Sequence, residues 1–250
     1  MPVPQPIIWQ VRPDGILTAI LWACKKLYYS IDRPGMNPRP LAEKLDDKIM
    51  GDLASVAVLE NLEGINVSAV AYDQVRRDNF RLPDPGWDIA IGKDALSWAN
   101  NPRDPMRPTG LFTASIRSSR LPRNDTLEQA VRTRDFKIFA QPNRTIVESI
   151  TADIEMQVYY NYQESQLNAR DIDQRRIAQS VQSIQVQEIK KLLNIERRYG
   201  RCFLTAWNYK TAIVQHSRTL ATPYWESFGK RMWFAPLRLG KDFKELKELG

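Results

Sequence analysis

The sequence predicts an α/β or α+β protein in which helices flank one mixed central β-sheet. Two observations predict this class. Segments with helical spacing of apolar residues occur beside runs rich in β-branched and aromatic residues, and they follow the order helix, helix, several strands, helix, strands. The 250 residues are enough for a sizeable core. We expect a single domain, made of an N-terminal helix and linker (1–40), a core (41–160), and a long helix followed by C-terminal strands (161–250).

Three segments place apolar residues three and four positions apart, the spacing that gives a helix one apolar face. They are predicted to be helices: 15–31, 41–62 and 171–197. Asp14 is expected to cap the first, because an aspartate side chain accepts hydrogen bonds from the free amides at a helix start. Residues 211–218 fit either a strand or a helix. Proline and turn residues predict loops at 32–40 and 93–110.

Further segments are rich in β-branched and aromatic residues, and this composition is typical of strands. The predicted strands are 65–76, 87–91, 110–120, 137–141, 149–162, 201–209 and 232–239. Because they lie between and after the helices, one sheet covered by helices can bury them all.

The charge is positive overall and unevenly distributed. The chain carries a formal net charge of +7, yet residues 41–101 carry a net −5, whereas 103–144 carry +5 and 210–250 carry +4. An acidic block beside basic blocks indicates a polyanion partner with a carboxylate site nearby. The alternative is that these charges are simply solvated surface.

Several familiar chemistries are excluded by what the sequence lacks. It has one histidine, His216, no GxSxG elbow, no GxxxxGK[ST] phosphate loop and no GxGxxG turn. Cys24 and Cys202 are isolated and are expected to be buried thiols. The absence of an 18-residue apolar run and of a signal-peptide pattern leads us to expect a cytoplasmic protein without membrane contact. What remains is carboxylate chemistry, with oxygen ligands suited to a hard cation such as Mg²⁺.

One stretch stands out, "FRLPDPGWDIAIG" at 80–92, where a charged proline-rich turn leads into a short apolar strand. Asp88 lies at the entrance of that strand. The stretch, with the preceding helix "KIMGDLASVAVLENL" and the following strand "FTASIRSSRLPR", resembles the PD-(D/E)xK nucleases, the superfamily that includes most type II restriction endonucleases. In that fold, helices precede a hairpin-like pair of strands; an Asp opens the first strand after a turn, and an acid-x-Lys lies on the next. The resemblance covers roughly 41–160.

The resemblance implies a metal site built around Asp88, with Mg²⁺ or Mn²⁺ as the cofactor. Phosphodiester hydrolysis uses such an ion to polarise the phosphate and to lower the pKa of the attacking water. Two acids on adjacent strands can hold the ion. A lysine two residues beyond the second acid shares its face of the strand, because strand side chains alternate.

The sequence departs from this pattern on the second strand, where Ser115, Ile116 and Arg117 stand in place of acid-x-Lys. Arg117 stays charged and can hold a phosphate but cannot act as a base. Ser55, at the helix position that often carries an additional acid, is also neutral. Two interpretations follow. Asp153 or Glu155 joins Asp88 as a displaced metal ligand, with Ser115 and Arg117 in the catalytic site, or the fold binds DNA without cutting it.

The end of the same strand is basic and rich in hydroxyls, which suits phosphate contacts. The residues expected to contact DNA are Arg117, Ser118, Ser119, Arg120 and Arg123. The Gln- and Arg-rich helix at 171–197 could also reach base edges. Each feature has a plainer explanation: Asp88 as a turn acid capping free amides, Asp153 and Glu155 as a solvated strand face, and the basic residues as exposed surface.

The leading hypothesis is a Mg²⁺-dependent type II restriction endonuclease that hydrolyses double-stranded DNA as a homodimer, since cutting both strands requires two sites. One rival is a catalytically degenerate nucleic-acid-binding module on the same fold. The other is an interaction protein with no nucleic-acid role, whose basic residues serve only solubility.

Overall fold

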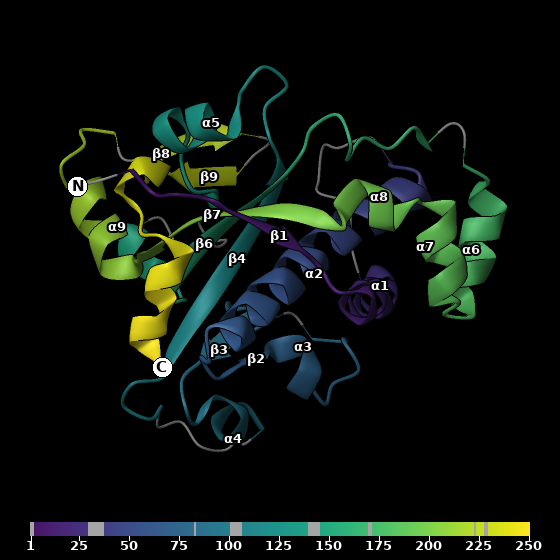
Figure 1. Ribbon diagram of the computed structural model, residues 1–250, viewed down its shortest axis with the longest axis horizontal. Coiled ribbons are helices and arrows are strands. Elements are labelled where there is room, and N and C mark those ends of the chain that lie inside the picture. Colours follow the sequence, from purple (N-terminus) through teal and green to yellow (C-terminus); the bar gives the residue numbers. More distant parts are fainter. Residues whose placement is uncertain are drawn as a thin grey trace.

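The computed structural model describes residues 3–29, 38–82, 84–100, 107–139, 146–169, 172–222, 224–227 and 230–250. Its centre is a curled, six-stranded mixed sheet with the strand order β1-β7-β6-β4-β3-β2 (Figure 1). The strands β4 and β6 are parallel, and every other neighbouring pair is antiparallel. The predicted α/β class with a mixed central sheet is therefore confirmed, whereas the expectation of one sheet for all strands is wrong, because segments within 137–141 and 232–239 belong to a second sheet.

The six strands of the main sheet differ in length, and the longest lie at its centre. Their bounds are β1 Ile7–Gln10, β2 Ala69–Ala71, β3 Ile89–Ile91, β4 Phe112–Arg120, β6 Ile154–Tyr160 and β7 Arg201–Tyr209. All seven residues of β6 are buried. Since alternate side chains of a strand point to opposite faces, β6 is covered by protein on both faces.

Helices cover one face of the sheet. Helix α1 (Pro13–Leu27) packs against α2 (Leu41–Gly64), and α2 lies across β4, β2 and β7 (Figure 1). The buried face of α2 follows the predicted apolar spacing, with Leu45, Ile49 and Leu53 fully inaccessible to solvent. These side chains join the even-numbered residues of β6 in the largest apolar cluster.

The opposite face is covered by a second, three-stranded sheet and short helices. That sheet has the order β5-β9-β8. The elements of this layer are α5 (Leu127–Thr133), β5 (Ile138–Phe139), the 3-10 helix η1 (Val147–Ser149), α9 (Lys210–Ser217), β8 (Tyr224–Ser227) and β9 (Lys230–Trp233). Tyr159 of β6 and Phe203 of β7 pack with Trp233 in a second apolar cluster here. The odd-numbered side chains of β4 and β6 thus point toward the second sheet.

The helix predicted at 171–197 is wrong as a single helix. Three shorter helices occupy the described part of it: α6 (Gln174–Gln182), α7 (Val186–Leu192) and α8 (Ile195–Tyr199). The chain reverses between them at Ile184 and Asn194, whose φ angles are 50° and 48°. These left-handed residues interrupt the helical hydrogen bonding, although the apolar spacing continues across the breaks.

Other boundaries also differ from expectation. The strand predicted at 65–76 shortens to β2, because the chain turns into α3 (Tyr72–Val75), where the Gln74 side chain accepts a hydrogen bond from the Ala71 amide. The helix α4 (Ala95–Asn100) lies within the predicted loop at 93–110. The segment 232–239 is only partly a strand; a 3-10 helix, η3 (Leu237–Leu239), follows β9. Elements with no counterpart in the prediction are β1, α5, β8 and the C-terminal 3-10 helix η4 (Phe243–Leu249).

The start of the first helix also differs from the prediction. Arg12, not Asp14, is the residue before α1, because Pro13 occupies the first helical position and places Asp14 in the first turn. The predicted loop at 32–40 falls largely outside the described residues.

Cys24 and Cys202 are buried free thiols, as expected. In the described part of the chain, none of the helices combines the length and apolar character needed to cross a bilayer.

Candidate functional site

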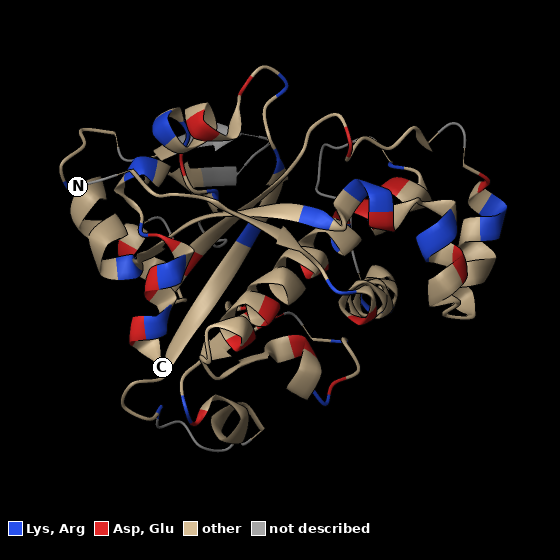
Figure 2. Cartoon of the chain, viewed as in Figure 1, with Lys and Arg blue, Asp and Glu red and all other residues tan. Residues whose placement is uncertain are grey.

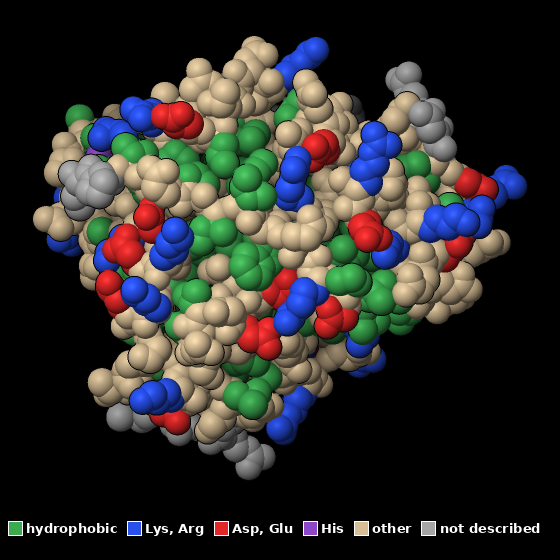
Figure 3. Space-filling model, viewed as in Figure 1, with side chains coloured by type: hydrophobic (Ala, Val, Ile, Leu, Met, Phe, Trp, Pro, Cys, Tyr) green, Lys and Arg blue, Asp and Glu red, His purple; other side chains and the backbone are tan. Residues whose placement is uncertain are grey.

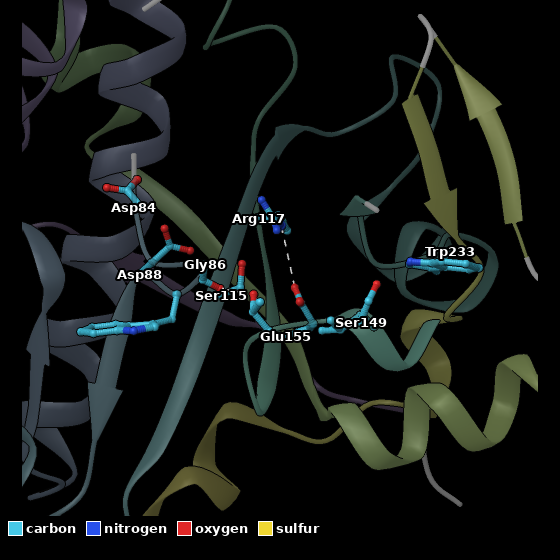
Figure 4. A pocket seen from close by; sticks show the side chains of 11 residues that line it. Asp84, Gly86, Asp88, Ser115, Arg117, Ser149, Glu155 and Trp233 are labelled. Carbon is cyan, nitrogen blue, oxygen red and sulfur yellow. Dashed lines mark hydrogen bonds and ion pairs between the residues drawn. The ribbon is translucent and has the colours of Figure 1, made fainter. Parts of the chain in front are cut away.

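A polar cavity of about 140 Å³ lies on the odd-numbered face of β4 and β6, where the entrance of β3 meets the second layer (Figure 4). Four residues predicted to be catalytic line it together: Asp88, Ser115, Arg117 and Glu155. The remaining lining residues are Asp84, Gly86, Trp87, Ser149, Ile150, Thr151 and Trp233. Figure 4 shows Asp84 and Asp88 on one side, Glu155 and Arg117 in the middle, and Trp233 beyond them.

Asp88 is held rigidly at the entrance of β3. Its amide donates to the Ala114 carbonyl at 2.8 Å, and its Oδ2 accepts a 2.6 Å hydrogen bond from the Ile116 amide. Both contacts follow from the antiparallel pairing of β3 with β4, which places Ile89 opposite Ala114. The carboxylate thus caps a backbone amide of the neighbouring strand, as the plainer explanation expects, and this contact also fixes it in the cavity.

The turn before Asp88 is fixed by a contact with the segment that leads into β6. Gly86 has φ of +95°, and its carbonyl accepts a 2.7 Å hydrogen bond from the Thr151 hydroxyl. A Cβ on Gly86 would lie 2.4 Å from the Thr151 Oγ1. Glycine is required here by both backbone conformation and space. The contact brings the two walls of the cavity together.

Glu155 reaches the cavity from β6, the strand parallel to β4. The register places Glu155 directly beside Ser115. Its side chain is only 2% exposed, and within the described residues its Oε2 accepts no hydrogen bond. The nearest cation is Arg117, whose Nε lies 3.8 Å from that oxygen. A buried carboxylate oxygen without a donor is costly, so such groups usually have a functional reason.

The two carboxylates interact electrostatically. Burial raises the pKa of Glu155 to about 7; the charge of Arg117 opposes this rise, and the charge of Asp88 adds to it. Burial also raises the pKa of Asp88, against the opposing effects of Arg117 and of the Ile116 amide. The charge of Asp84 adds to the rise at Asp88. Neighbouring acids whose pKa values are raised by burial and by nearby carboxylates, beside an arginine, are typical of functional sites.

Asp84 adds a third carboxylate at the mouth of the cavity. Its Oδ1 accepts a 2.8 Å hydrogen bond from Arg76 Nη1. Arg76 also binds Asp73 and Asp78, so the loop that contains Asp84 is anchored by one buried guanidinium. Pro83, its partner in the sequence pattern, lies outside the described residues.

Asp153 lies outside the cavity. Its carboxylate accepts hydrogen bonds from the Thr113 amide at 2.7 Å and the Thr113 hydroxyl at 2.8 Å, and it forms an ion pair with Arg107. The backbone here links the starts of β4 and β6, since the Asp153 amide donates to the Thr113 carbonyl. Of the two acids considered for the second ligand, only Glu155 points into the cavity.

The residues expected to contact DNA are placed differently from one another. Arg120 turns inward, where it donates to Asp46, to the Tyr199 hydroxyl and to the Ser165 carbonyl. Ser119 is buried and accepts a hydrogen bond from Gln157, and Ser118 lies on the α2 side of the sheet near Gly51. Arg123 is exposed in the loop after β4. Arg117 alone among the five lines the cavity.

Sequence reasoning did not identify the far wall of the cavity. Ser149 comes from η1 and Trp233 from β9, both in the second layer. No local motif marks these residues, because the contact depends on how the second sheet packs. On α2, Ser55 does not line the cavity, whereas Asp52, one turn earlier, is buried in an ion pair with Lys26.

The site residues fit a divalent cation held by few protein ligands. Mg²⁺ is often bound through one or two carboxylates while water fills its other positions. Asp88 and Glu155 supply two carboxylates, and the Glu155 Oε2 is a buried acceptor that a cation would satisfy. Within the described residues, no three or more His, Cys, Asp or Glu side chains gather tightly enough to form a complete protein cage for a metal.

The comparisons with known proteins give no relationship: no family model, no curated protein and no solved structure matches the chain.

Proposed function

We propose that this chain is a Mg²⁺- or Mn²⁺-dependent deoxyribonuclease with a restriction-endonuclease-like fold, acting on double-stranded DNA. The observation that carries the proposal is the convergence of Asp88, Glu155 and Arg117 in one small polar cavity. The carboxylates, the guanidinium and the hydroxyl groups that line the cavity suit a phosphodiester group with a bound cation. The chemistry proposed is therefore hydrolysis of the backbone.

The arrangement of elements supports the same family. A long helix, α2, precedes the antiparallel pair β3 and β4, and Asp88 opens the first strand of that pair after a turn. Ser115 and Arg117 occupy the second strand, where the family has its acid and lysine. The helix, the turn and the strand pair thus match the resemblance seen in the sequence.

The missing acid on β4 is compensated from the neighbouring strand. Because Ser115 pairs in register with Glu155, the Glu155 side chain starts about 4.8 Å from the family position, one strand spacing away. Both side chains line the same cavity. We therefore assign the second carboxylate to Glu155 and not to Asp153.

Each residue has a defined part in this proposal. Asp88 and Glu155 would hold the cation, which when bound polarises the scissile phosphate and acidifies a water molecule. Arg117, charged at every working pH, binds a phosphate oxygen and stabilises the charge that develops on it. Ser115 contributes a hydroxyl that orients water or phosphate. Asp84 raises the negative charge at the mouth.

A cleavage assay tests the proposal. The parent chain, Asp88→Asn and Glu155→Gln are incubated with Mg²⁺ or Mn²⁺ and genomic DNA of several base compositions, which covers unknown recognition sequences. We expect the parent to give discrete fragments and each variant to be slower by at least about a hundredfold, the scale for removing a main electrostatic contact. Asp94→Asn, an exposed acid outside the cavity, is the matched control and should cut like the parent.

A second candidate function is DNA binding without cleavage, favoured by Ser115 and Arg117 in place of acid and lysine. It predicts strong, salt-dependent binding by the parent and no fragments with any divalent ion. A parent that neither binds nor cuts DNA at low salt would contradict both candidates.

A further inference from the structure

A second polar cleft, separate from the cavity, lies in the layer that contains the three-stranded sheet. This cleft has a volume of about 400 Å³ and lies where α5, the end of β4, β6 and β9 meet. Its charged lining residues are Arg120, Arg134, Asp135 and Lys137, and its walls include Tyr159 and Phe234. Arg120 and Arg134 are paired with carboxylates outside the cleft, Asp46 and Asp125, so the positive charge offered to a ligand comes mainly from Lys137.

We propose that this cleft binds a second backbone phosphate of the DNA molecule whose scissile phosphate occupies the cavity. The inference rests on the proposed function and extends it, because it names the residues that hold the DNA beside the point of cleavage.

Geometry supports one DNA strand reaching both places. Glu155, Gln157 and Tyr159 lie on the same face of β6, with Glu155 in the cavity and Tyr159 in the cleft. Four residues of strand correspond to about 13 Å, which is a few nucleotides along a DNA strand. On β9, Trp233 lines the cavity and its neighbours Met232 and Phe234 line the cleft. The two hollows therefore border the same strands.

The polar groups between the two hollows are already satisfied. The Gln157 side chain donates to the Ser119 hydroxyl at 3.0 Å and accepts from the Lys137 amide at 3.3 Å. This fixes the backbone of Lys137 against the main sheet. The lysine is thus presented from a rigid base rather than from a loose loop, which reduces the entropy lost on binding.

Lys137 is the cation best suited to an incoming phosphate. In the described part of the chain its ammonium group has no ion pair, whereas Arg120 is bound to Asp46 and Arg134 to Asp125. Partial desolvation and the nearby charge of Arg120 lower the pKa of Lys137, although the residue itself is exposed. A phosphate would reverse this effect by supplying the missing negative charge.

Tyr159 provides a neutral donor in the same cleft. Burial raises the pKa of its phenol to about 12, so the hydroxyl keeps its proton at any working pH. Asp135 is the opposing group, and burial raises the pKa of its carboxyl, an effect that His216 partly opposes. Lys137, which forms no ion pair within the described residues, and the half-exposed Arg134 face Asp135, so the cleft can attract an anion.

The test measures DNA binding without cleavage, by fluorescence anisotropy of a labelled duplex in EDTA over a range of salt concentrations. Lys137→Gln is the main variant, because the lysine side chain is exposed and its removal leaves the core intact. Arg134→Gln is the second variant. Lys191→Gln, which removes an exposed lysine on α7, is the matched control.

We expect Lys137→Gln to weaken binding severalfold at moderate salt and to reduce the slope of log K against log [salt] by about 0.9, the value for one lost phosphate contact. Arg134→Gln should act in the same direction, and Lys191→Gln should leave the slope unchanged. Parent-like binding by Lys137→Gln, or an equal loss in Lys191→Gln, would overturn the assignment of the cleft while leaving the cleavage proposal intact. Failure of the parent chain itself to bind would overturn both.

Discussion

At the scale of single residues, the site consists of groups that cost the folded state stability. Glu155 is buried beside Asp88, and Arg117 at 3.8 Å only partly offsets its charge. A carboxyl group whose pKa rises on folding binds protons more tightly in the native state than in the unfolded one. Burial of Glu155 therefore makes the metal-free protein less stable as pH increases.

This gives a prediction for stability against pH, measured by urea unfolding in EDTA. A glutamate in the unfolded chain has a pKa of 4.5, and burial raises the pKa of Glu155 in the folded protein to about 7. Stability should therefore fall as pH rises between these two values and level off above them. The loss corresponds to about 3 kcal/mol. Glu155→Gln should remove its own part of this dependence and be more stable than the parent at pH 8, whereas Asp52, whose pKa burial also raises to about 7, keeps its part.

A Glu155→Gln variant that is less stable than the parent at pH 8 would show that the carboxylate is well accommodated, contrary to its lack of a hydrogen-bond donor. Exposed Glu128→Gln on α5 is the control and should leave the pH profile unchanged.

The sequence predicted part of this residue-scale picture. The turn and strand pattern was enough to single out Asp88, and the strand pattern identified Glu155 as a candidate. Alternation alone could not separate Glu155 from Asp153, because both share one face of an ideal strand. Their difference comes from Thr113 and Arg107, which bind Asp153, and that contact depends on tertiary structure.

At the scale of elements, one buried ionic network joins the helices at the end of the sheet to α2. Asp46 on α2 accepts hydrogen bonds from Arg198 at 2.7 and 2.9 Å, from Arg120 at 2.9 Å and from the Tyr199 hydroxyl at 2.8 Å. Asp46 and Arg198 are 1% and 6% exposed. The network fixes the short helix α8 against α2 and the end of β4.

Asp46→Asn should therefore destabilise the protein by about 3–5 kcal/mol, because it leaves the buried guanidinium of Arg198 and the partly buried one of Arg120 without their carboxylate. The neighbouring Asp47→Asn is the control: Asp47 is 45% exposed, pairs with Arg39 and lies 3.9 Å from Arg120 Nη1, so its loss should cost less than about 1 kcal/mol. Urea unfolding measures both. Equal stability of the two variants would mean that the network contributes nothing to joining these elements.

The same region shows what sequence patterns can predict about elements. Apolar spacing was right about helical content in 171–197 but missed two breaks, since Ile184 is not a residue that signals a left-handed turn. Asn194, by contrast, is common in that conformation. The helix α5 carries a visible signal, a capping box formed by Thr126 and Gln129. A helix start of this kind can be predicted from a few neighbouring residues. The second sheet cannot, because β5 pairs with β9, which lies about 90 residues later in the chain.

At the scale of the whole molecule, the charge blocks have a structural explanation in part. Acids of the negative block, including Asp52, Asp73 and Asp78, form ion pairs with Lys26 or Arg76. Figure 2 shows that most charged residues lie on helices and loops, with few on the main sheet. On the face seen in Figure 3, basic and acidic side chains are interspersed. Net charge alone therefore does not locate a DNA-binding surface. The proposed DNA contacts rest instead on the residues that line the cavity and the cleft.

The proposed cleavage of both strands of a duplex predicts a homodimer, because two antiparallel strands are related by a twofold axis that one site cannot satisfy. Light scattering of the full chain should give twice the mass of 28.9 kDa. A monomer that remains monomeric on a DNA duplex would be expected to nick one strand, so the ratio of nicked to linear plasmid checks the same prediction.

The most direct test of the central claim is the rate of DNA cleavage by the parent and by Glu155→Gln, measured under single-turnover conditions with Mn²⁺ and saturating protein. We expect discrete fragments from the parent, a rate lower by at least about a hundredfold in the variant, and no cleavage by either in EDTA. Cleavage by Glu155→Gln at the parental rate, or a parent that binds DNA yet never cuts it with any divalent ion, would contradict the assignment of this cavity as a nuclease site.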